Sequence, residues 1–121
     1  METREVEKYW MRDLKSKFDD LNFEFTSFLN EFESFNCSND KIENEISAHR
    51  TIIAKIKESI STFDEENGRQ LNISETDFSK FTDRRNEIQK NISDELQILK
   101  QFEFKIGNFC ADLEEDEYAE F

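Results

Sequence analysis

The fold is decided by the stretch LNISETDFSKFTDRRNEIQKNISDELQIL (Leu71–Leu99), which predicts both the start and the buried face of a long helix. Ser74 is favourable just before a helix, because its hydroxyl can accept a hydrogen bond from an amide of the first turn. Asp77 follows three residues later, as in a capping box, and Ile73 and Phe78 occupy the two positions of a hydrophobic staple. We therefore expect a helix to begin directly after Ser74.

Apolar residues in this stretch recur at steps of three and four residues, which places them on one face of the helix. The same spacing continues beyond the stretch, so the helix is predicted to cover residues 75–113. Arg85 and Glu95 take two positions of the apolar seam, and Gly107 costs about 1 kcal/mol relative to alanine in a helix. The seam consists of Phe78, Phe81, Ile88, Ile92, Leu99, Phe102, Ile106, Phe109 and Leu113.

Two further amphipathic helices precede this one, over residues 3–35 and 40–64. The first is broad for a two-stranded seam, because Phe23 and Leu29 widen its apolar face, and a broad face suits a bundle. A turn around residues 36–39 separates the two, with Ser38, Asn39 or Asp40 as the residue that caps the second helix. The seams are Val6, Trp10, Leu14, Phe18, Leu21, Phe25, Phe28, Phe32 and Phe35, then Ile42, Ile46, His49, Ile53, Ile56, Ile60 and Phe63.

Three seams joined by short connections predict an all-α fold, an antiparallel up-down-up three-helix bundle with a long third helix. Residues 1–121 would form a single domain that ends in an acidic tail at 114–121. The part of the third helix after Phe102 would either pack on the first helix or project. The alternative architecture is an elongated coiled-coil hairpin that needs a partner.

The charge balance restricts the classes of partner. The chain has 29 acidic and 16 basic residues, a net charge of −13, which repels nucleic acid and anionic membrane surfaces. No apolar run is long enough to span a bilayer, and the N-terminus lacks the apolar segment of a secretory signal. Cys37 and Cys110 are too few for a disulfide framework, so we expect two free thiols in a reducing, cytosolic compartment.

The sequence offers little that could support catalysis, and we expect no enzyme, metal site or cofactor. His49 is the only histidine, so a histidine cluster is excluded, and its place in a seam favours a packing role over a functional one. Arg85 and Glu95 would either run their stems along the core edge or mark a groove for a partner. The candidate partner surface is Phe23, Leu29, Arg85 and Glu95.

The segment Lys57–Phe78 and the helix that follows it resemble the N-terminal three-helix domain of syntaxin-6-type SNARE proteins. Glu58, Ser59 and Ile60 match the family's acidic, hydroxyl and isoleucine positions near the end of the second helix. Asn67-Gly68 stands at the turn, and the matching entry to the third helix is Ile73, Glu75, Asp77 and Phe78, before the basic pair Arg84-Arg85.

This resemblance implies a regulatory domain of a SNARE that acts in vesicle trafficking and membrane fusion. Its partners would be other SNARE or tethering proteins, and it would lie at the cytoplasmic face of Golgi or endosomal membranes without inserting into them. The alternative function is a structural helical subunit of a tethering, cytoskeletal or kinetochore assembly.

Overall fold

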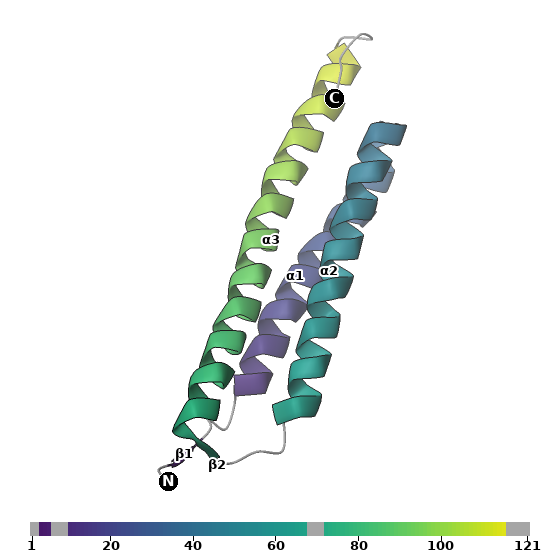
Figure 1. Cartoon of the computed structure of the whole chain (residues 1–121). Helices are drawn as coiled ribbons and strands as arrows, with labels where there is room; N and C mark the ends of the chain where they lie inside the picture. The colour runs from purple at the N-terminus through teal and green to yellow at the C-terminus, as the bar shows by residue number, and fades with distance from the viewer. Residues whose placement is uncertain (1–2, 6–9, 68–71, 116–121) are drawn as a thin grey trace.

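The computed structural model describes residues 3–5, 10–67 and 72–115, and it confirms the all-α three-helix bundle (Figure 1). Helices α1 and α3 run in the same direction, and α2 runs antiparallel between them in the chain order. The longest helix is α3, as expected. The elements are β1 (Thr3–Glu5), α1 (Trp10–Phe35), α2 (Asp40–Asn67), β2 (Asn72–Ser74) and α3 (Glu75–Glu115).

The first helix is shorter than predicted, because its expected N-terminal part forms a strand instead. Thr3–Glu5 pairs antiparallel with Asn72–Ser74, so that Thr3 lies opposite Ser74. Backbone groups of the strand that leads into α3 thus satisfy those of β1, and α1 begins only at Trp10. Predictions that concern Val6, Gly68 and the tail from residue 116 onward lie outside the described residues.

The helix caps follow the sequence closely. Ser74 Oγ accepts a hydrogen bond from the Asp77 amide at 3.2 Å, which confirms the predicted start of α3. At α2, Asn39 is the cap among the three candidates, because its Oδ1 accepts a hydrogen bond from the Ile42 amide at 2.9 Å. Both caps satisfy amides that have no partner within their helices.

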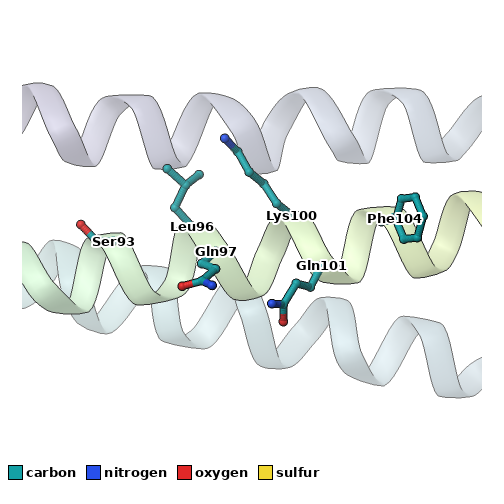
Figure 2. Close-up of a pocket in the computed structure, with 6 residues that line it drawn as sticks. All are labelled: Ser93, Leu96, Gln97, Lys100, Gln101 and Phe104. Carbon is teal, nitrogen blue, oxygen red and sulfur yellow. The ribbon is translucent and has the colours of Figure 1, made fainter.

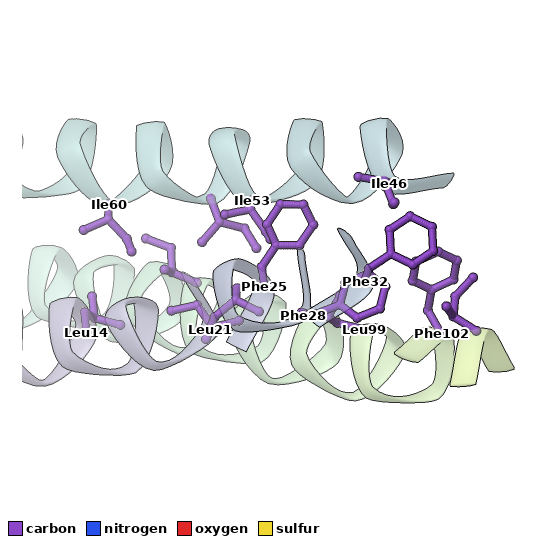
Figure 3. Close-up of a cluster of buried hydrophobic side chains, with 14 of the residues drawn as sticks. Leu14, Leu21, Phe25, Phe28, Phe32, Ile46, Ile53, Ile60, Leu99 and Phe102 are labelled. Atoms are coloured by element: carbon purple, nitrogen blue, oxygen red, sulfur yellow. The ribbon is translucent and has the colours of Figure 1, made fainter. Parts of the chain in front are cut away.

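The three seams meet in one apolar core that runs the length of the bundle (Figure 3). Each helix contributes side chains that are fully buried, for example Leu21, Ile42 and Leu99. A core shared by all three helices is incompatible with an elongated hairpin that needs a partner. The other core residues labelled in Figure 3 are Leu14, Phe25, Phe28, Phe32, Ile46, Ile53, Ile60 and Phe102.

Aromatic rings close the end of the core next to the strands. The Trp10 ring lies 4.8 Å from that of Phe63 and 4.7 Å from that of Phe81, centroid to centroid, and an exposed ion pair joins Lys15 to Asp64 at 3.1 Å. The contact between Trp10 and Phe81 is edge-to-face, a geometry that adds stability beyond the buried area. This end is therefore held by residues of all three helices.

Past Phe102, α3 packs on the bundle and does not project. Ile106 is fully buried and Phe109 is 7% exposed. The predicted seam residue Phe35 is 43% exposed, and Phe23, which the sequence placed on the candidate partner surface, is 72% exposed. Phe23 lies two residues from both Leu21 and Phe25, about 200° around the helix, and so points away from the core.

Candidate interaction groove and its surroundings

Cys37 and Cys110 form a disulfide, with their Cα atoms 5.8 Å apart, so the expectation of two free thiols is wrong. Cys37 lies in the turn between α1 and α2, and Cys110 lies near the end of α3. Both residues are buried. The spacing of 73 residues carried no sign of this contact, because it depends on where α3 meets the turn in three dimensions.

The strongest candidate site is a groove between α2 and α3 with a volume of 340 Å³. Its apolar rim consists of Ile52, which is 41% exposed, and Ile98, which is 51% exposed. Lys55 and Asp94 add one charge of each sign at the exposed edge. The groove is lined by Ile52, Lys55, Ile56, Ser59, Asn91, Asp94, Glu95 and Ile98.

A buried polar pair lies beside this groove. His49 Nδ1 is 2.6 Å from Glu95 Oε1, and Glu95 is 3% exposed. We assign the proton to Nδ1, because a carboxylate can only accept. The His49 ring also contacts Phe102, with centroids 4.9 Å apart. Glu95 therefore does not run along the core edge to solvent, as one sequence interpretation had it, but is paired inside the bundle.

The four residues of the predicted partner surface do not come together. Phe23 points outward from α1, whereas Leu29 packs partly against the core. The Arg85 guanidinium lies 5.9 Å from the centroid of the Phe81 ring, ten residues and about 15 Å along α3 from Glu95. Only Glu95 lines the groove.

The residues that form the groove rim were not predicted from the sequence as part of a site. Neither Ile52 nor Ile98 belongs to the seams that were predicted from the sequence. Each directly precedes a buried seam residue, Ile53 or Leu99, on the side of its helix that faces the other helix. An apolar residue that flanks the seam on each of two adjacent helices is the signal that could have located this site.

A second depression, with a volume of 530 Å³, lies on the outer face of α3 (Figure 2). Phe104 is 73% exposed there, and Lys100 and Leu96 lean toward α1. All six lining residues belong to α3, namely Ser93, Leu96, Gln97, Lys100, Gln101 and Phe104. With no opposing wall, this depression holds a ligand less firmly than a groove between two helices.

Carboxyl groups gather between α1 and α3 near this depression. Burial raises the pKa of Glu103 to about 7, helped by a hydrogen bond with Glu24 and by the negative charges of Glu24 and Glu31, while Lys100 acts in the opposite direction. Burial and like charge both disfavour the ionised form. Glu103 is thus protonated near neutrality in part of the molecules.

Among residues 10–67 and 72–115, no three histidine, cysteine or acidic side chains lie close enough to hold a metal ion. None of the helices that the structure describes is both long enough and apolar enough to cross a membrane. Comparison with family models, curated proteins and solved structures finds no match for this chain. What the described surface offers chemically is a groove with an apolar rim and one exposed charge of each sign.

Proposed function

We propose that this chain is a non-enzymatic protein-interaction domain that binds a helical segment of a partner in the α2–α3 groove. The exposure of Ile52 and Ile98 on facing sides of two helices carries this proposal. Covering the isoleucine side chains at this rim removes apolar surface from water and would stabilise a complex with a partner. An amphipathic helix laid along a groove between two helices is an established recognition mode.

The charge of the domain favours a basic partner. A net charge of −13 attracts Lys and Arg side chains over distances of several ångströms. The partner helix would place apolar residues against Ile52 and Ile98 and a basic residue toward Asp94, away from Lys55. Electrostatic attraction of this kind speeds association and selects partners more than it strengthens binding.

We place this activity in a SNARE protein, as a regulatory domain in vesicle trafficking and membrane fusion at the cytoplasmic face of Golgi or endosomal membranes. The proposal is supported by the up-down-up order of the helices and by the resemblance at the entry to α3. Within that entry, Ser74 and Asp77 form the cap contact. Partners would be SNARE or tethering proteins.

Binding can be tested by nuclear magnetic resonance with the oxidised chain and basic amphipathic helical peptides from SNARE and tethering proteins. Resonances of Ile52, Ile98 and Asn91 should shift together on titration. Ile52→Asp or Ile98→Asp should weaken binding by about tenfold or more, because each buries a carboxylate against apolar side chains. Phe23→Asp is the matched control and should bind normally. Shifts confined to residues away from the groove would refute the proposal.

A structural subunit of a larger helical assembly is the second candidate, and outward-facing Phe104 favours it, because its side chain is 73% exposed. Such a subunit should self-associate or be poorly folded when isolated. Sedimentation of the isolated chain distinguishes the two, since an interaction domain should be a monomer that unfolds cooperatively. Concentration-dependent association that Phe104→Ser abolishes would favour the assembly.

A further inference from the structure

The last turns of α3, from Gly107 to Glu115, form an intrinsically weak helix. A Cβ built at Gly107 would meet nothing within 4 Å, so packing does not require a glycine there, and glycine lowers helix stability. The last turn has no basic residue, and Asp112 places negative charge near the negative end of the helix dipole. This segment would fray if nothing held it.

A covalent bond holds the segment to the rest of the bundle. Cys110 lies three residues beyond Gly107 and is joined to Cys37. Cys37 itself sits in a short turn that is fixed by the Asn39 cap of α2. Besides this bond, the segment contributes one well-buried apolar side chain, Phe109, and one partly buried side chain, Leu113.

The opposite end of the bundle does not depend on this bond. It is held by the paired strands, by the rings of Trp10, Phe63 and Phe81 and by the ion pair between Lys15 and Asp64. Elements with separate sets of contacts open as separate units. Loss of the disulfide should therefore release the end of α3 while the rest stays folded.

We propose that the Cys37–Cys110 disulfide is a reversible redox latch, opened by a dithiol reductant, that controls whether α3 stays ordered beyond Gly107. A thiolate of the reductant attacks one cysteine sulfur, forms a mixed disulfide and releases the other cysteine, which takes up a proton. The second thiol of the reductant then displaces the first cysteine, so two electrons pass to the protein and the reductant leaves as a disulfide.

Burial makes the latch conditional. Cys37 is 7% exposed and Cys110 is 9% exposed, so a reductant reaches the intact bond only during brief local openings of the surrounding turns. Once opened, the two thiols and the Phe109 side chain become accessible together. The reduced chain would thus present an apolar and thiol-bearing surface that the oxidised chain conceals.

Hydrogen exchange followed by mass spectrometry tests the latch on the full chain, with dithiothreitol as reductant and oxidised glutathione to reverse it. On reduction, amides of residues 107–115 should exchange about tenfold faster or more, whereas those of residues 88–99 should change less than about twofold. Reoxidation should restore the slow exchange. Equal acceleration in all three helices, no acceleration, or failure to reduce the folded chain would each overturn the proposal.

Two variants make the test specific. The double variant Cys37→Ala with Cys110→Ala should exchange like the reduced chain and should not respond to dithiothreitol. Adding Gly107→Ala to it should slow exchange of the segment by about fivefold, because alanine favours the helix. If Gly107→Ala changes nothing in that background, helix weakness does not govern the release and the proposal fails.

Discussion

Replacement of Glu95 or His49 gives the sharpest test of how the bundle is built, because the two side chains are buried as a pair. Their polar atoms are 2.6 Å apart, and the side chains are 9% and 3% exposed for His49 and Glu95. His49→Leu would leave a carboxylate in the core without its partner. Breaking a buried pair from one side costs about 3–5 kcal/mol.

The magnitudes differ among the variants in a defined order. Glu95→Leu leaves an imidazole N–H without an acceptor and should lower the free energy of unfolding by about 1–3 kcal/mol. Glu95→Gln keeps an acceptor of the same shape and should cost less than Glu95→Leu. The double variant, with leucine at both positions, removes both polar groups. Its free energy of unfolding should be unchanged or higher by up to about 1–4 kcal/mol.

Urea unfolding of the oxidised chain, followed by far-ultraviolet circular dichroism, measures each free energy of unfolding, and an unchanged slope confirms that the same surface is exposed. The double-mutant cycle should give a coupling of several kcal/mol, because the costs of the single variants do not add. Additive losses at His49 and Glu95 would refute the reasoning, since they would mean that the two side chains do not depend on each other.

Three further predictions concern the core, the cap and the pH dependence. Phe28→Ala and Ile56→Ala should each lower the free energy of unfolding by about 2–5 kcal/mol, with the exposed Phe23→Ala as control; losses under about 1 kcal/mol would contradict a shared core. Ser74→Ala should cost about 0.5–2 kcal/mol in the same assay, because the Asp77 amide loses its acceptor. Glu103 has a folded pKa of about 7 against an ordinary 4.5, so the folded chain binds this proton more tightly and its stability falls as the pH rises between those values. Glu103→Gln should stabilise the fold by less than about 1 kcal/mol above that range, since the group is partly exposed, and should have little effect below it.

The sequence predicted the bundle well because its information is local. Helix seams are visible as steps of three and four residues, and capping depends on side chains only three residues apart, as with Ser74 and Asp77. The width of a seam was harder to judge. Phe23 looked like part of a broad face, yet its position is about 200° from those of its buried neighbours.

The features that the sequence missed are contacts between distant segments. The strand Thr3–Glu5 has a helix-compatible pattern, and only its pairing with Asn72–Ser74 makes it extended. Cys37 and Cys110 meet because α3 is long enough to reach the turn after α1. Likewise, one interpretation of the sequence placed Glu95 at the core edge, because no nearby residue indicates that it pairs with His49 on another helix.

The buried pair also explains why the similar seams of α2 and α3 pack in a single alignment. Steps of seven residues on α2 connect Ile42, His49 and Ile56, and on α3 they connect Ile88, Glu95 and Phe102. A slip of α3 by seven residues would place Glu95 opposite an isoleucine and leave both polar groups unpaired in the core, at a cost of several kcal/mol. Seams made only of apolar residues would tolerate the slipped alignment much better. In coiled coils, likewise, one buried polar residue can fix the register. We therefore expect the pair to contribute to the uniqueness of the fold more than to its stability. A unique alignment is also what brings Ile52 opposite Ile98 and lets Cys110 reach Cys37.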